Sequence, residues 1–236
     1  MGAFDVLLVG GGITGCEAAW ALARAGVRTL LVTTSLDTVY TLFSDRAELS
    51  PPAGSLMATA VAALGAEHGS WALHRQVKGA LEAEPGLHLL QSSVSGLIVQ
   101  AGRVAGVTTW EGVDRRAGRV ALCVGSFLGA RLRIGQSEEA AGRLSEMSYD
   151  DLFQDLQAHG FEFRAQRMEA PQVHGSLPYT VQFSTFAPTE WRPDTFELPR
   201  LGGLHAAGLC VDPELRYEQA ARQGMLLARR LLDQRE

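Results

Sequence analysis

The stretch Val6–Ala19 reads Val-Leu-Leu-Val-Gly-Gly-Gly-Ile-Thr-Gly-Cys-Glu-Ala-Ala, an apolar run that breaks into glycines and continues as an alanine-rich segment. The glycines fit a G-x-G-x-x-G fingerprint, in which they allow a tight turn, the approach of a pyrophosphate and close helix–strand packing. A helix predicted over Cys16–Ala25 and closed by Gly26 follows directly, so its first N–H groups face a bound phosphate. The stretch therefore predicts a dinucleotide-binding turn, with the phosphates held by Gly10, Gly11, Gly12, Ile13, Thr14 and Gly15.

Composition agrees with an α/β protein of one large or two small domains, since 236 residues at 46% hydrophobic can bury a sizeable core. No segment approaches the roughly 18 apolar residues of a membrane span. The chain begins on a strand without a charged leader, so we expect no membrane association and a cytoplasmic location. The net charge of −5 gives no general attraction for nucleic acid. Three scattered cysteines and six histidines show no disulfide or metal-ligand spacing, so we expect no metal site.

A second strand, Thr29–Thr33, completes a β-α-β unit. Folds of this kind usually place an acidic residue near its end to bind the ribose. Here hydroxyl residues occupy that place, so the ribose contact falls to Thr33, Thr34 or a backbone group, or to Asp37 reaching back. The following segment, Thr38–Ser55, lacks periodicity and predicts a loop over the carboxyl ends of the strands, where ligands bind in this architecture.

The remaining chain alternates between helical and strand patterns. Helices are predicted over Met57–Leu64, Trp71–Leu81 and Tyr217–Leu232. A β excursion at about 87–118 contains three short strands predicted to be antiparallel, and an irregular bridge covers about 165–200. Buried strands are predicted at Val120–Val124, which ends in Gly125-Ser126, and at Gly203–Gly208. The fold class is thus α/β, Rossmann-like, with a parallel sheet plus a small antiparallel β excursion.

This order of elements resembles the flavoproteins with two dinucleotide-binding domains, and more specifically the GidA family, also called MnmG, of FAD-dependent tRNA uridine-modifying enzymes. The similar blocks are Thr29–Thr38, Gly102–Val107, Gly125–Gly129, Ile134-Gly135, Ala141–Arg143, Gly203–Gly208 and Tyr217–Gly224. They follow the family's order and cover most of the chain. The resemblance implies that residues 1–236 form a single FAD-binding domain.

The resemblance also implies roles for single residues. Val94 meets the adenine through its backbone, although an ordinary core position explains it equally well. Gly125 and Ser126 end a strand that faces the cofactor, and Gly208, Leu209 and Tyr217 lie against the flavin. Ser148 contacts the cofactor by analogy, but its place before a helix predicted over Tyr149–Ala158 favours an N-cap. The motif at Gly208 favours FAD over NAD, which remains a weaker alternative.

The chain also departs from the family pattern. From the resemblance we expect the bridge to replace the family's inserted nicotinamide-binding domain and the C-terminal tRNA-engaging domain to be missing, and the family's redox-loop cysteine falls near Ser44. Cys210 is the one thiol with a plausible redox position, but a buried structural thiol is the favoured interpretation. Asp212 and Glu214 fit proton donors or simply an exposed loop.

The family resemblance therefore predicts FAD binding and no competence for tRNA modification. Two functional classes remain open. One is a small flavin-dependent oxidoreductase with an unknown small-molecule or protein partner. The other is a non-catalytic protein that holds flavin in an accessory or regulatory role.

Overall fold

A parallel sheet forms the centre of the computed structural model, which describes residues 4–43, 48–65, 69–170 and 178–234. Its strands are β1 (Phe4–Val9), β2 (Thr29–Thr33), β3 (Leu87–Gln91), β6 (Asp114–Leu122) and β13 (Leu204–Ala206). They lie in the order β3-β2-β1-β6-β13, with Leu8 of β1 opposite Leu31 of β2 and Ala121 of β6. β2 is buried along its whole length, as expected for a parallel strand with both faces covered. This confirms the predicted Rossmann-like fold class.

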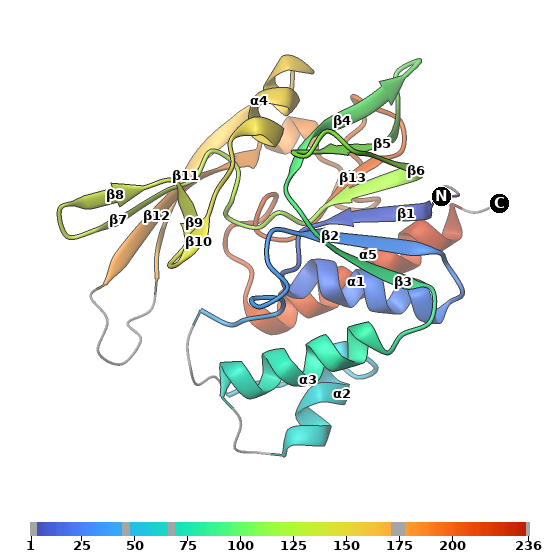
Figure 1. The fold of residues 1–236 in the computed structure, drawn as a ribbon, viewed down its shortest axis with the longest axis vertical. Helices are drawn as coiled ribbons and strands as arrows, with labels where there is room; N and C mark the ends of the chain where they lie inside the picture. Colours follow the sequence, from blue (N-terminus) through green and yellow to red (C-terminus); the bar gives the residue numbers. More distant parts are fainter. Residues whose placement is uncertain (1–3, 44–47, 66–68, 171–177, 235–236) are drawn as a thin grey trace.

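β6 belongs to two sheets at once. Its second half pairs in parallel with β1, whereas Asp114–Arg116 pair antiparallel with β5 (Arg103–Thr109). β5 in turn pairs with β4 (Val94–Gln100), so these strands form the antiparallel part of the predicted excursion. The excursion is therefore continuous with the central sheet (Figure 1).

The prediction that the excursion begins with an antiparallel strand at His88–Gln91 was wrong, because β3 pairs in parallel with β2. β3 is the edge strand of the parallel sheet and has no fully buried residue. Partly exposed edge strands alternate in hydropathy as antiparallel strands do, and the sequence pattern does not separate the two cases.

The prediction of an irregular bridge at about 165–200 was wrong in part, because much of this segment forms strands. β11 (Phe163–Glu169) and β12 (Tyr179–Phe186) pair antiparallel and form a four-stranded sheet with β7 (Arg131–Ile134) and β8 (Ser137–Glu139). One face of this sheet buries its own small core around Val181 and Phe183. The end of the bridge contains a short 3₁₀ helix, η1 (Pro188–Glu190).

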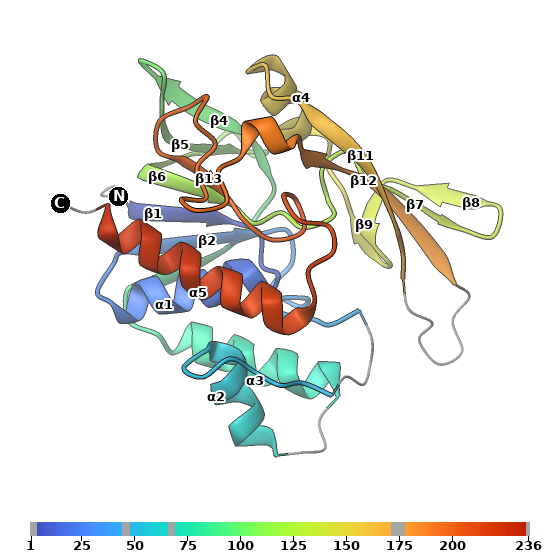
Figure 2. The ribbon, with the colours of Figure 1, turned by 180° about the vertical axis from the view of Figure 1, so that it is seen from behind.

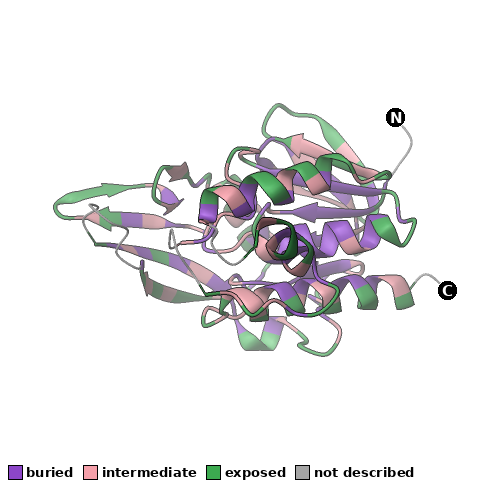
Figure 3. Cartoon of the chain, turned by 90° about the horizontal axis from the view of Figure 1, so that it is seen from below, coloured by how far each residue is buried: buried purple, intermediate pink, exposed green. Residues whose placement is uncertain are grey.

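Helices cover the parallel sheet mainly on one face. α1 (Ile13–Arg24) and α5 (Tyr217–Asp233) lie directly on it, and α2 (Leu56–Leu64) and α3 (Ser70–Glu82) lie beyond them (Figures 1 and 2). Figure 3 shows the buried residues concentrated between these layers. Helices were predicted at all four places, and their bounds agree within a few residues.

Two further segments border the central fold on its other side. α4 (Asp151–Ala158) packs on β4, where an Asp155 carboxylate oxygen accepts the N–H of Leu97 at 2.9 Å. β9 (Ala141–Arg143) and β10 (Glu146–Met147) form a small hairpin, and β9 contacts β7 and β12 of the four-stranded sheet. Two large cores result, one on each face of the parallel sheet.

The contact between α1 and α5 depends on Gly224. A Cβ at this position would lie 2.5 Å from the carbonyl oxygen of Thr14 and 2.7 Å from Cβ of Glu17. The first of these neighbours is backbone, so it moves only if α1 moves. Gly224 therefore fixes how closely α5 approaches the start of α1.

We expect Gly224→Ala to lower the free energy of unfolding by about 1–3 kcal/mol, because the added methyl group overpacks a helix–helix contact. Urea denaturation measures this change. Gly79→Ala is the matched control, since nothing lies within 4 Å of its added Cβ in α3. That control should gain about 0.5–1 kcal/mol, because glycine is unfavourable inside a helix. Equal stability of Gly224→Ala and the parent would contradict the packing argument.

Candidate functional site

A cavity of about 630 Å³ lies at the carboxyl ends of β1, β2 and β6. Among the residues that the sequence assigns to cofactor binding, all but Gly15 and Ser148 line it: Gly10, Gly11, Gly12, Ile13, Thr14, Thr33, Thr34, Val94, Gly125, Ser126, Gly208, Leu209 and Tyr217. The fold thus brings together residues that are more than 200 positions apart in sequence. Their role as cofactor contacts remains a prediction.

The glycine turn after β1 has the geometry of a phosphate cradle. Gly10 has φ +116°, and a Cβ there would lie 2.2 Å from the carbonyl oxygen of Cys123. A Cβ on Gly15 would lie 2.0 Å from the carbonyl oxygen of Gly10, so Gly15 supports the turn from behind. At Gly12, by contrast, no atom of the described residues lies within 4 Å of an added Cβ. The turn is tightly packed toward the protein and open toward the cavity.

Within the described part of the chain, no side chain caps the N-terminus of α1. Gly12 is the N-cap residue, no side-chain cap hydrogen bond is formed, and the first turn contains no acidic residue. The first N–H groups of a helix have no partner within the helix and carry partial positive charge. Together with the open space at Gly12, they can hold an anionic pyrophosphate.

The candidates for the ribose contact lie in different places relative to the cavity. Thr33 and Thr34 both line the cavity, and the Thr33 hydroxyl donates to the carbonyl oxygen of Ser35 at 3.3 Å. The exposed Asp37 carboxylate instead pairs with Lys78 at 3.3 Å and does not line the cavity. Asp37 therefore lies away from the cavity wall, and the ribose contact of Thr33, Thr34 or a backbone group stays a prediction.

Beyond the threonines, the cavity wall continues along Ser92, Ser93 and Val94. Val94 is buried and also packs into the core between β4 and the parallel sheet. Its side chain is thus a core residue, and because the segment also lines the cavity, the contact of its backbone with adenine stays a prediction.

Two serines support the wall around Gly125 instead of capping a helix. The Ser126 hydroxyl donates to the carbonyl oxygen of Gly142 at 2.7 Å, and the Ser148 hydroxyl donates to that of Phe127 at 2.6 Å. The N-cap position of α4 belongs to Asp150, so the prediction that Ser148 caps the helix was wrong. Ser148 holds the strand end in place from outside the cavity.

The opposite end of the cavity is built by the turn before α5. Gly208 has φ +88°, and its N–H donates to Gln223 Oε1 at 2.5 Å. The Thr14 hydroxyl donates to the carbonyl oxygen of Ala220 at 3.2 Å, which ties α1 to α5 at this point. Tyr217 opens α5, and its hydroxyl oxygen accepts the N–H of Phe43 at 3.0 Å. The N-termini of two helices therefore border one cavity.

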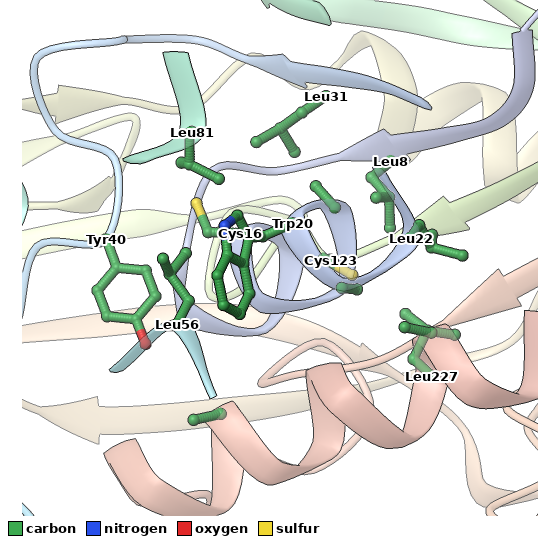
Figure 4. Close-up of a cluster of buried hydrophobic side chains, with 14 of the residues drawn as sticks. Leu8, Cys16, Trp20, Leu22, Leu31, Tyr40, Leu56, Leu81, Cys123 and Leu227 are labelled. Atoms are coloured by element: carbon green, nitrogen blue, oxygen red, sulfur yellow. The ribbon is translucent and has the colours of Figure 1, made fainter. Parts of the chain in front are cut away.

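The loop after β2 is fixed by the buried carboxylate of Glu17 in α1. It accepts the N–H groups of Leu56 and Met57, each at 2.8 Å, and the hydroxyl of Tyr40 at 2.5 Å. Tyr40 adopts φ 59° and donates its own N–H to the carbonyl oxygen of Gly11 at 2.9 Å. Burial raises the pKa of Glu17 against the effect of these donors. Figure 4 shows Tyr40 beside Leu56 near the start of α1.

Sequence reasoning missed the residues that close the cavity on this side. The Arg143 guanidinium donates to the carbonyl oxygen of Thr41 at 2.8 Å and to that of Leu42, and lies 4.8 Å from the Phe43 ring centroid. Its Nε is 3.5 Å from a carboxylate oxygen of Glu146. Burial raises the pKa of Glu146, opposed by Arg143 and by a hydrogen bond with Thr38. The one sequence signal for this cluster was the resemblance of the Ala141–Arg143 block to the family.

All three cysteines are buried, and burial raises the pKa of each thiol. Burial raises the pKa of Cys210 to about 12. Its thiol donates to the carbonyl oxygens of Leu122 and Ala207, which supports the structural interpretation of this cysteine. Cys123 lines the cavity, whereas Ser44 lies outside the described residues.

Neither a metal site nor a membrane span is found in the part of the chain that the structure describes. No group of three or more metal-ligating side chains gathers there. No described helix is long and apolar enough to cross a bilayer.

Comparison with known proteins identifies related sequences and structures. A family model described as glucose inhibited division protein A matches residues 5–79 and 59–176. The tRNA uridine 5-carboxymethylaminomethyl modification enzyme MnmG of Lactobacillus delbrueckii subsp. bulgaricus is 31% identical over 196 residues. Its counterpart in Chlamydia felis is 28% identical over 238 residues. These matches cover 71% and 89% of this chain but only 31% and 38% of the two enzymes, so the chain spans about a third of their length.

Solved structures agree over the whole chain. The GidA-related protein from Thermus thermophilus superposes with a TM-score of 0.90 at 44% identity, covering 98% of this chain and 99% of that one. Aquifex aeolicus GidA has the same fold, with a TM-score of 0.84 at 17% identity over 98% of this chain and 66% of its own. By the family match, which spans more than half of its residues, the chain belongs to the glucose inhibited division protein A (GidA) family.

Proposed function

We propose that the chain binds one FAD in the 630 Å³ cavity. The pyrophosphate lies on the glycine turn and the start of α1, and the adenosine extends toward Thr33, Thr34 and Val94. The flavin extends the other way, toward Gly208, Leu209 and the start of α5. The observation that carries this proposal is the contrast between Gly10 and Gly12: the turn has no room for side chains toward the protein and open space on the cavity side.

We favour FAD over NAD because the motif at Gly208, which resembles the family's closing flavin-side motif, lines the same cavity as the glycine turn. The wall runs from Val94 on the excursion to Tyr217 on α5, past the helix N-terminus at Gly12. FAD supplies a ring that accepts two electrons with a hydride. The start of α5 provides partial positive charge, which stabilises negative charge on that ring when it is reduced.

The activity that this site supports best is that of a flavin-dependent oxidoreductase acting on a small molecule. The cavity continues past the cofactor segments to Phe43, Arg143, Glu146 and Met168, which leaves space beside the flavin end for a second ligand. A purely flavin-holding protein needs no such space, so a role restricted to holding flavin is the second candidate.

We further propose that this chain alone does not modify tRNA. Thiol chemistry needs a thiolate. The three cysteines of the sequence are all buried with raised pKa values, and the position that resembles the family's redox-loop cysteine is Ser44. The MnmG relatives are named for the modification activity, and this chain spans about a third of their length.

We expect the purified protein to be yellow with about one FAD per chain, and Gly12→Asp to lose the cofactor. The new carboxylate would occupy the phosphate position, a repulsion of several kcal/mol at short range, or about a hundredfold in Kd or more. Aspartate is also a good N-cap, so the variant should fold with an unchanged or higher Tm. Absorbance at 450 nm and fluorescence titration with FAD measure the binding.

Gly79→Asp is the control for this experiment, since it makes the same charge change on an exposed position of α3. It should keep full FAD occupancy. Full occupancy in Gly12→Asp would show that the phosphates lie elsewhere.

We expect no new nucleoside when the FAD-loaded chain is incubated with hypomodified tRNA, tetrahydrofolate and a suitable GTPase partner. Mass spectrometry of the digested tRNA measures the product, and a full-length MnmG serves as the positive control. A modified uridine in the reaction with this chain would show that a group other than a cysteine thiol does the chemistry here.

A further inference from the structure

Part of the cavity is lined by segments that do not belong to the parallel sheet, and we call this part the outer compartment. Its walls are Phe43 from the loop after β2, Arg143, Glu146 and Met147 from the β9–β10 hairpin, Met168 from β11 and Tyr217 from α5. The contacts of Arg143 with the loop and of Tyr217 with the Phe43 N–H hold these segments together. The compartment therefore has an apolar and aromatic wall with one ion pair in it.

The positive charge of this ion pair is already engaged. All three nitrogens of the Arg143 guanidinium have protein partners: the carbonyl oxygens of Thr41 and Leu42, and the carboxylate of Glu146. Arg143 is 17% exposed and Glu146 is 15% exposed, so both lie largely out of bulk water. A guanidinium held in this way is poorly placed to bind a phosphate or carboxylate of a second ligand.

The charged side chains that line the cavity also disfavour an anionic second ligand. Its lining contains the carboxylates of Glu48, Glu146, Glu214 and Glu218 but only two cationic side chains, Arg143 and Arg216, among the described residues. The Glu218 carboxylate accepts the N–H of Ser50 at 3.0 Å, which holds it at this rim. A cleft with an excess of one charge sign repels ligands of the same sign, and salt weakens the repulsion.

We propose that the outer compartment admits a neutral or cationic organic molecule with a ring that packs on its apolar wall, and that it selects against polyanions. The inference rests on the proposed FAD binding and names the class of its redox partner. A neutral hydride donor placed there loses one hydrogen with its bonding electron pair to the FAD ring and becomes a cation. The carboxylate of Glu146 and the acidic rim stabilise that cationic product.

Two donors with the same reacting ring and different charge test the proposal. These are 1-benzyl-1,4-dihydronicotinamide, which is uncharged, and NADH, which carries two phosphates. Anaerobic stopped-flow mixing with the FAD-loaded full chain records bleaching at 450 nm, and each rate is divided by the rate of the same donor with free FAD. We expect the normalised rate of the neutral donor to be about tenfold higher or more at low salt, since the rim repels the anion.

Salt provides a readout that needs no variant. Between low salt and about 0.3 M, the rate with NADH should rise severalfold because like charges are screened, whereas the rate with the neutral donor should change less than about twofold. Slow reduction by NADH is thus expected even at millimolar concentration.

Three variants distinguish the effect of the Arg143–Glu146 ion pair from the effect of the acidic rim. Glu146→Gln releases Arg143 from its carboxylate, so it should shift the normalised preference toward NADH by about tenfold. Glu214→Gln removes an exposed charge at the rim. It should shift the normalised preference toward NADH as well, but by a smaller factor than Glu146→Gln. Glu139→Gln makes the same charge change on the exposed strand β8 and should leave the preference unchanged.

The outcomes are distinguishable from those of the FAD proposal. A colourless protein that binds no FAD overturns both. If the protein is yellow and dithionite bleaches it, a faster normalised rate with NADH that falls with salt overturns the outer compartment alone. The same holds if the neutral donor fails to bleach the flavin, or if Glu139→Gln shifts the preference as much as Glu146→Gln does.

Discussion

The buried carboxylate of Glu17 is the interaction on which the arrangement of the site depends. It lies in α1, directly behind the glycine turn, and it accepts the Tyr40 hydroxyl and the first N–H groups of α2. Leaving such buried donors unpaired costs about 1–3 kcal/mol each. Because Tyr40 also donates its N–H to Gly11, the loop after β2 is fixed to the same turn that faces the phosphate position. The loop therefore takes its place from the helix that it covers.

The parts of the site that sequence could predict are those built from contiguous segments. The glycine turn depends on backbone conformation and on the absence of side chains, and both are visible in Gly10, Gly12 and Gly15. The helices also follow from local periodicity, so their positions were predicted closely. Thr33 and Thr34 were predicted to line the site because they lie at the end of the second strand, where such folds usually place the residue that binds the ribose.

The parts that sequence missed depend on pairing between distant segments. β3 alternates as an antiparallel strand would, and only its neighbour β2 makes it parallel. β12 gains its place from β7, which lies far upstream, and β11 in turn pairs with β12. Arg143 carries no local signal for its contacts, because Thr41 and Leu42 are about 100 residues away. Ser148 was predicted to be a cap, since the sequence does not show that its hydroxyl reaches Phe127.

The glycine turn is built from backbone and the outer compartment from side chains, so membership of the family predicts the first better than the second. The proposed phosphate cradle at Gly10–Thr14 offers mainly backbone N–H groups, so we expect it to tolerate many side-chain changes elsewhere. The outer compartment is formed by side chains such as Phe43, Glu146 and Met168, and one substitution there changes its charge or shape. If the proposed site is correct, a chain of the GidA fold can keep the cradle while the ligand beside it changes. Function in this fold follows from the side chains beside the cofactor end of the cavity, and the fold itself fixes only where that end lies.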